Sequence, residues 1–185
     1  MFRIALFCAL ALCAVTAPAE DFDGPPPPRW SWQSDEPANP KIDMAAYLGV
    51  ANEAAVHRAK RRVSEEEFMR MAREPGTVVL DARSPAKYDL LHVKGAISLS
   101  FPDIDIASLA RVLPDKNARI LIYCNNNFGG NEVAFASKSA NASLNLSTYI
   151  ALYSYGYRNV YELGPFVDIA DTKLELVPSQ QVAQH

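Results

Sequence analysis

The chain has 185 residues, of which 18 are basic and 21 acidic, so its formal net charge at pH 7 is −3. This length suits one domain with an ordinary hydrophobic core together with additional segments. The acidic excess argues against nucleic acid as a partner.

Residues 1–19 have the features of a secretory signal peptide. Arg3 provides a positive start, residues 4–16 are apolar, and the Ala-Pro-Ala sequence that ends at Ala19 suits cleavage. The apolar stretch is too short for a membrane span. We therefore expect a periplasmic or secreted protein whose mature chain begins at Glu20 and does not associate with the membrane.

Cleavage after Ala19 would leave 166 residues, with 17 basic and 21 acidic side chains and a formal charge of −4. Cys8 and Cys13 would be lost, so Cys124 would be the one remaining cysteine. A lone thiol in an oxidising compartment either pairs with a partner or has a chemical use. The alternative is a small buried hydrophobic residue, but the position of Cys124 favours chemistry.

Two segments precede the predicted domain. Residues 20–40 are rich in proline and acidic residues and are expected to form an extended linker. Asp43 is expected to cap a helix that runs to about Lys60 within the segment 41–62. The apolar residues of this helix form one stripe, namely Met44, Tyr47, Leu48, Ala51 and Ala55. Its basic end, from Arg58 to Arg62, is interpreted as a solvated helix terminus.

The domain itself is predicted at residues 63–177, followed by a tail at 178–185. Ser64 and Glu67 have the spacing of a capping box, so a helix is expected to begin there and to stop at Pro75 and Gly76. Residues 82–95 are expected to be irregular. Strands are predicted at 78–81, 96–99, 120–123 and 159–163, and further helices from Asp103 or Asp105 to about Val112 and at 149–155, the last ending at Gly156. Strands alternating with helices predict an α/β fold with a mainly parallel open sheet and helices on both faces.

The stretch around Cys124 is the candidate functional site. Residues 120–123 form a continuous apolar run, which is typical of a strand buried on both faces. Cys124 would then lie at the carboxyl end of that strand, where ligands bind in open α/β sheets.

The motifs of the chain are similar to those of the rhodanese family of sulfurtransferases, over about residues 63–163. The matching residues are an Asp-x-Arg pair after one strand, a His-x-x-Gly-Ala turn and the strand-end cysteine: Asp81, Arg83, His92, Gly95, Ala96 and Cys124. The resemblance implies a rhodanese-like fold, with Cys124 carrying a persulfide. It implies that the loop after the cysteine binds the substrate, through Asn125, Asn126, Asn127, Phe128, Gly129 and Gly130. Asp81, Arg83 and His92 are expected to have a framework role.

The cysteine loop departs from the family pattern. Gly129 stands where many rhodaneses carry an arginine, so the fixed cation for an anionic substrate is missing. Phosphatase chemistry, which needs such an arginine, is therefore not expected. The asparagines donate only neutral hydrogen bonds, which are about half as strong as charge-assisted ones. Residues 125–145 look like an insertion, and Lys138 within it could supply the missing charge.

Two hypotheses remain. The first is an exported sulfurtransferase or persulfide carrier that uses Cys124, handles thiosulfate poorly and meets a small sulfur donor or a persulfide-carrying protein. The second is a rhodanese-fold binding module that recognises a partner or a small ligand. A thiol-disulfide oxidoreductase is disfavoured because the chain has no Cys-x-x-Cys pair. No metal site and no cofactor are predicted.

Overall fold

The computed structural model describes residues 39–179, of which residues 40–179 belong to one compact unit. The expected signal peptide, nearly all of the expected linker and residues 180–185 of the tail lie outside the described residues. The segment 41–62 and the predicted domain belong to the same compact unit.

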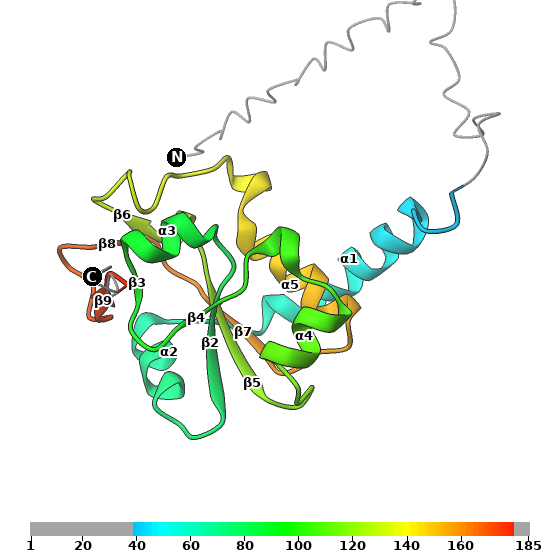
Figure 1. The fold of residues 1–185 in the computed structure, drawn as a ribbon, viewed down its shortest axis with the longest axis horizontal. Helices are drawn as coiled ribbons and strands as arrows, with labels where there is room; N and C mark the ends of the chain where they lie inside the picture. The colour runs from blue at the N-terminus through cyan, green and yellow to red at the C-terminus, as the bar shows by residue number, and fades with distance from the viewer. Residues whose placement is uncertain (1–38, 180–185) are drawn as a thin grey trace, which may run out of the picture. The chain divides into compact units, whose positions relative to one another are not determined.

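Helices and strands follow one another along most of the described chain, with consecutive strands within residues 92–98 and 160–177 (Figure 1). The helices are α1 Met44–Ala59, α2 Glu65–Ala72, α3 Pro85–Leu90, α4 Ile106–Val112 and α5 Leu144–Ser154, with short 3-10 turns η1 Phe101–Asp103, η2 Asn125–Asn127 and η3 Ala140–Ala142. The strands are β1 Arg62–Val63, β2 Thr77–Asp81, β3 His92–Val93, β4 Ile97–Ser98, β5 Arg119–Tyr123, β6 Phe128–Gly129, β7 Val160–Leu163, β8 Val167–Asp168 and β9 Leu176–Val177.

A five-stranded sheet with the strand order β1-β7-β5-β2-β4 forms the centre of the domain. Each neighbouring pair in it is parallel. Strand β5 lies in the middle, and its residues Ile120 to Tyr123 are buried, as their apolar pattern predicts. The predicted α/β fold with a mainly parallel open sheet is confirmed.

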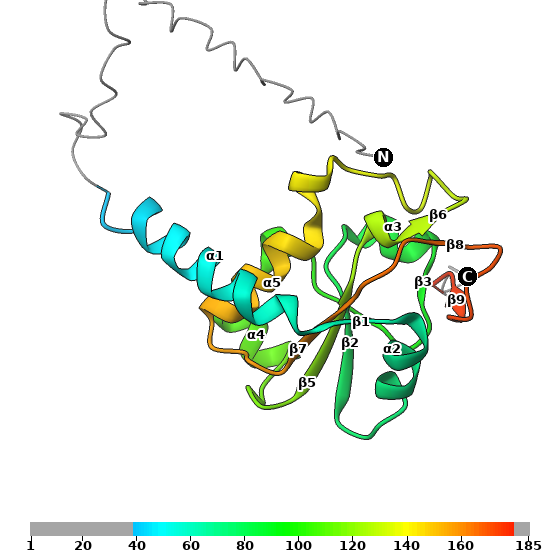
Figure 2. The ribbon, with the colours of Figure 1, turned by 180° about the vertical axis from the view of Figure 1, so that it is seen from behind.

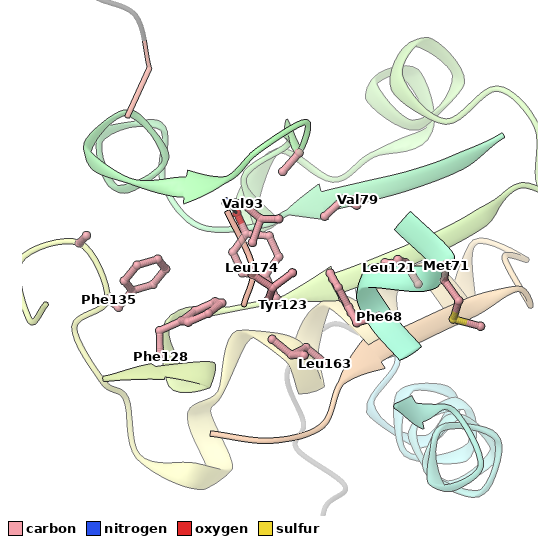
Figure 3. Close-up of a cluster of buried hydrophobic side chains, with 12 residues drawn as sticks. Phe68, Met71, Val79, Val93, Leu121, Tyr123, Phe128, Phe135, Leu163 and Leu174 are labelled. Carbon is pink, nitrogen blue, oxygen red and sulfur yellow. Dashed lines mark hydrogen bonds between the residues drawn. The ribbon is translucent and has the colours of Figure 1, made fainter. Parts of the chain in front are cut away.

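Helices cover both faces of this sheet (Figure 2). On one face, α1, α4 and α5 pack on the sheet through a cluster that includes Ala54, Leu109 and Leu152. On the other face, α2 contributes Phe68 and Met71 to a second cluster, which contains Leu121, Tyr123 and Leu163 of the sheet (Figure 3). Alternate residues of β5 therefore point into different clusters, which is the period expected of a strand buried on both sides.

Helix α1 begins as predicted, because the Asp43 side chain accepts a hydrogen bond from the Ala46 backbone N–H at 2.8 Å. The predicted apolar stripe is wrong, since Met44, Tyr47 and Leu48 are at least half exposed. The face that packs on the domain instead carries Ala54, which is fully buried, together with polar side chains that bond to α5 and β7. Hydrophobic periodicity does not identify a face held by polar contacts.

Two further predictions about helices need correction. The Ser64 side chain accepts from the Glu67 N–H, but the Glu67 carboxylate binds Arg70, so only half of the expected capping box forms. The stretch at 82–95, expected to be irregular, contains helix α3, which begins with Pro85 in its first turn. Proline suits that position because it needs no N–H there and its φ is already helical.

The segment after Cys124 is more ordered than predicted. Its first residues form η2 and β6, and the last helix starts at Leu144, five residues before its expected start at Tyr149. Gly156 has the predicted positive φ of 92° just past the end of this helix. Two small pairings, β6 with β8 and β3 with β9, tie residues 164–177 to the rest of the domain.

Candidate functional site

Cys124 lies immediately after β5, at the carboxyl edge of the sheet, as the sequence predicts. Its Sγ atom accepts a hydrogen bond from the Asn126 backbone N–H at 3.4 Å and lies 3.4 Å from the Ser143 hydroxyl. The residue is buried, with 1% of its surface exposed. Two hydrogen-bonding groups thus contact the sulfur, one from the turn after the strand and one from the residue before α5.

The three asparagines after the cysteine mainly hold the loop in place. Asn127 Oδ1 accepts from the Cys124 backbone N–H at 2.9 Å, and its Nδ2 donates to the Leu163 carbonyl at 2.8 Å. The Asn126 amide bonds to both the N–H and the carbonyl of Lys138, and the Asn125 amide donates to the Ala136 carbonyl. These side chains connect the cysteine to the neighbouring strand and to the segment before α5.

Phe128, Gly129 and Gly130 lie away from the sulfur contacts. The Phe128 ring packs edge-on to Tyr123 and against Phe135 in the core cluster (Figure 3). A Cβ atom on Gly129 would lie 2.6 Å from the Phe166 ring, so any side chain there would have to displace that ring. Gly130 has a φ of 87°, which favours glycine. These three residues shape the return of the chain, whereas the hydrogen-bonding groups at Sγ belong to Asn126 and Ser143.

Asp81 and Arg83 form a buried ion pair beside the site. Arg83 is 2% exposed; it donates to both carboxylate oxygens of Asp81 and to the carbonyls of Ala134 and Leu91. Burial by itself would lower the pKa of Arg83, but its hydrogen bond to Asp81 and the charge of that carboxylate raise it above the usual value. The guanidinium therefore stays charged and holds three segments together.

Tyr123 and His92 belong to the same framework. The Tyr123 hydroxyl donates to Asp81 at 2.6 Å and accepts from the Val93 N–H at 3.0 Å. Burial and the nearby carboxylate raise the pKa of Tyr123. The His92 ring stacks on Tyr88, with centroids 3.7 Å apart, and its Nδ1 bonds to the Tyr88 carbonyl. His92 is thus occupied by framework contacts.

A hollow with a volume of about 220 Å³ opens onto Cys124. Of the predicted loop residues, Asn126 and Asn127 line it, whereas Asn125 lines a neighbouring hollow of about 290 Å³ together with Lys87 and Lys138. The predicted alternative cation, Lys138, therefore lies in the second hollow and not in the one that contains the sulfur.

The lining of the Cys124 hollow includes residues that sequence interpretation missed. Arg58 of α1 and Arg62 of β1, interpreted above as part of a solvated helix end, lie in its wall with Glu162 of β7. Ser143 also lines the hollow. No local signal marks these residues. Strand β1 is held at the site by its pairing with β7, and α1 by the contact of Arg58 with Glu162, about 100 residues later in the chain.

Among residues 39–179, no group of three or more histidine, cysteine, aspartate and glutamate side chains is arranged to hold a metal ion. In the same part of the chain, none of the helices has the length and apolar character needed to cross a membrane.

The fold and the strand-end cysteine define an α/β domain with one buried thiol at the ligand-binding edge of its sheet. Residues 64–163 match the rhodanese-like domain. The chain belongs to the rhodanese-like domain family.

Similarity extends to individual proteins. A curated relative, the thiosulfate sulfurtransferase PspE of Escherichia coli K12, is 29% identical over 96 residues, which are 52% of this chain and 77% of the relative. A solved structure described as a rhodanese with anions from E. coli has 24% identity and a TM-score of 0.38, and covers 55% of this chain and 98% of its own. A thiosulfate sulfurtransferase from Pseudomonas aeruginosa has 19% identity and a TM-score of 0.44, and covers 72% of this chain and 24% of its own.

Proposed function

We propose that the protein transfers sulfur through Cys124, as a sulfurtransferase or a persulfide carrier. Membership of the rhodanese-like family and similarity to a curated thiosulfate sulfurtransferase support this function. The observation that carries it is the position of Sγ, which borders a hollow at the carboxyl edge of the sheet and contacts two hydrogen-bonding groups.

The reaction has two displacement steps. The Cys124 thiolate attacks the outer sulfur of a donor, so the new Sγ–S bond forms as the donor's own bond to that sulfur breaks. The remainder of the donor leaves with the bonding electron pair; for thiosulfate it leaves as sulfite. A nucleophilic acceptor then attacks the outer sulfur of the persulfide and releases the thiolate.

The surroundings of Sγ suit the thiolate that this chemistry needs. The Asn126 N–H donates to the sulfur, and the Ser143 hydroxyl is within reach to do the same. Ser143 immediately precedes helix α5, and the positive end of a helix dipole favours a nearby negative charge. Among the residues that the structure describes, no histidine lines the hollow, so the thiolate relies on these groups and on the solvent for its formation.

We further propose that thiosulfate is a slow donor compared with polysulfide or a protein persulfide. The cysteine loop offers only neutral donors to a dianion, because Gly129 stands in place of the family's arginine. Export to the periplasm or beyond is part of the same proposal. It rests on residues 1–19, which lie outside the described part of the chain.

Persulfide formation tests this function directly. Wild type and Cys124→Ser should be incubated with thiosulfate and with polysulfide, then analysed by intact-mass spectrometry for an added sulfur that reductant removes. We expect the addition in wild type alone, and faster with polysulfide. If wild type gains no sulfur from either donor while iodoacetamide still alkylates Cys124, sulfur transfer is wrong.

One observation favours the second hypothesis, a binding module. Only 1% of the Cys124 surface is exposed, whereas a nucleophile that reacts with two substrates in turn must be accessible to both. The neighbouring hollow lined by Asn125, Lys87 and Lys138 would then be the ligand site. Failure of persulfide loading, together with a small anion that stabilises the wild type against heat, would support this alternative.

A further inference from the structure

We infer that Arg62 is the anion-binding residue of the Cys124 hollow, and that it holds the charged oxygen group of the sulfur donor. Arg62 precedes residues 64–163, which match the family, so the charge that the cysteine loop lacks comes from outside the matched region. The identity of the anion as a sulfur donor rests on the proposed function, whereas the binding of an anion beside Sγ does not.

Strand register places Arg62 and Cys124 at the same edge of the sheet. Arg62 pairs with Glu162 between β1 and β7, and Glu162 pairs with Ile122 between β7 and β5. Cys124 comes two residues after Ile122, so its side chain leaves the sheet on the same face. The side chains of Arg62, Glu162 and Cys124 all line the hollow on that face.

Gly164 lies beside Arg62 in the wall, where a Cβ atom would come 3.0 Å from the Val63 carbonyl oxygen and 3.7 Å from the Arg62 Cβ. Gly164 comes two residues after Glu162, just as Cys124 comes two residues after Ile122. It lines the hollow without a side chain. The Arg62 guanidinium donates to the Gly164 carbonyl at 3.1 Å. This contact fixes one side of the guanidinium at the wall, while 49% of the side chain remains exposed and able to meet a ligand.

The charges in the wall leave an excess of one positive unit. Within residues 39–179, the charged residues that line the hollow are Arg58, Arg62 and Glu162. Arg58 donates to both carboxylate oxygens of Glu162, which is only 4% exposed, so these two charges offset each other. Arg62 forms a longer ion pair with the same carboxylate, at 3.8 Å and without a hydrogen bond, so two guanidinium groups share one carboxylate and one positive charge is left in excess.

The cysteine loop itself provides no positive charge to the hollow. A side chain at residue 129 would have to displace the Phe166 ring, which itself lines the hollow. Lys138 lines the neighbouring hollow. The arrangement suits a donor with a reactive terminal sulfur at Sγ and a single anionic group, such as a carboxylate, at Arg62. The one excess positive charge of the wall does not balance the two negative charges of thiosulfate, which therefore remains a slow donor.

Two alkylating reagents measure this charge without requiring sulfur transfer. Iodoacetate and iodoacetamide both place a CH₂ group on Sγ and release iodide, but only iodoacetate carries a carboxylate. We expect Arg62→Gln to lower the ratio of the iodoacetate rate to the iodoacetamide rate at Cys124 by about fivefold, the effect of one charge within several ångströms in a water-exposed site. Arg62→Lys should retain most of the ratio.

Arg61→Gln is the matched control because it removes the same charge from the adjacent residue. The Arg61 guanidinium lies over the Tyr161 ring, and Arg61 lines a different hollow. We expect it to leave the rate ratio within about twofold of wild type. If the rate ratio fell equally in Arg61→Gln and Arg62→Gln, the inference would be overturned, because the loss of net charge alone would explain the fall.

A second measurement separates the anion site from sulfur transfer. The KM for thiosulfate should rise about fivefold or more in Arg62→Gln, with little change in kcat. An unchanged alkylation ratio in a folded Arg62→Gln variant would overturn the anion site whatever the sulfur chemistry shows. A lowered ratio in a protein that accepts no sulfur would support the anion site and refute sulfur transfer. Failure of both reagents to modify native Cys124 would refute the hollow as the route to the sulfur.

Discussion

The Sγ atom of Cys124 lies 3.4 Å from the Oγ atom of Ser143, the residue immediately before helix α5. The two residues are 19 positions apart in the chain. The long segment between them therefore folds so that the carboxyl end of β5 lies beside the start of α5. This contact keeps a hydroxyl and a helix N-terminus beside the sulfur despite the intervening residues.

Ser143→Ala should slow the reaction of Cys124 with iodoacetamide by roughly two- to tenfold, because a neutral hydrogen bond contributes about 0.5–1.5 kcal/mol. The Ser143 side chain makes no cap hydrogen bond, so helix α5 should remain intact. Ser139→Ala is the control, since Ser139 also precedes a helical turn without a side-chain cap bond. Equal alkylation rates in wild type and Ser143→Ala would show that the hydroxyl does not activate the sulfur.

Arg83→Ala should lower the free energy of unfolding by about 3–5 kcal/mol, because it leaves the buried Asp81 carboxylate without its partner. Denaturation in urea gives this value. Arg70→Ala is the comparison, since Arg70 forms exposed ion pairs with Glu67 and Glu74 and its loss should change stability little. If Arg83→Ala were as stable as wild type yet failed to load sulfur, Arg83 would belong to the reacting site.

The centre of the fold could be predicted from local sequence because strongly local signals specify it. The apolar run at 120–123 is long enough to identify a buried strand, and it places Cys124 at the edge. The caps at Asp43 and Ser64 are likewise set by side chains three residues from their partners. Such features depend on neighbours in the sequence, so they can be predicted without knowledge of the fold.

The wall of the hollow could not be predicted because it depends on distant pairing. Strand β1 has two residues, too few for any periodic signal, and its position follows from its pairing with β7. The start of α5 was also missed, because its first turn contains Asn145, whose side chain bonds to Asn127 across the site. Tertiary hydrogen bonds there outweigh weak local helix propensity.

Gly130→Ala should destabilise the protein by about 1–2 kcal/mol or more, because alanine is strained at a φ of 87° and its Cβ would lie 2.7 Å from Asp168. Gly49→Ala gives the opposite expectation. Gly49 lies within α1 with nothing near its Cβ position, so alanine should stabilise the helix by about 0.5–1 kcal/mol. The urea midpoints of the two variants test the expected loss of stability in Gly130→Ala and the expected gain in Gly49→Ala. A Gly130→Ala protein as stable as wild type would contradict the positive φ assigned to this turn.

The pKa of His57 is lowered from its usual value of 6.5, first by burial and then by the charges of Arg61 and Arg158. The ring lies against α5, where its Nδ1 is 2.7 Å from the Tyr149 hydroxyl and its centroid is 5.3 Å from that of Tyr153. Burial is also the main cause that raises the pKa of Tyr149 to about 12. Tyr149 is therefore neutral near pH 6 and provides no negative charge to balance a protonated imidazole.

The folded protein thus binds a proton at His57 less readily than the unfolded chain does, so the unfolded state holds more protons as the pH falls through 6.5. Stability should decrease over that range, and the packing of α1 on α5 should weaken with it. His57→Gln should remove this part of the pH dependence, with a smaller loss of unfolding free energy than wild type shows between about pH 7.5 and 5.5. Urea denaturation of both proteins at constant ionic strength provides the comparison. Parallel stability curves across this range would mean that protonation of His57 is not coupled to folding.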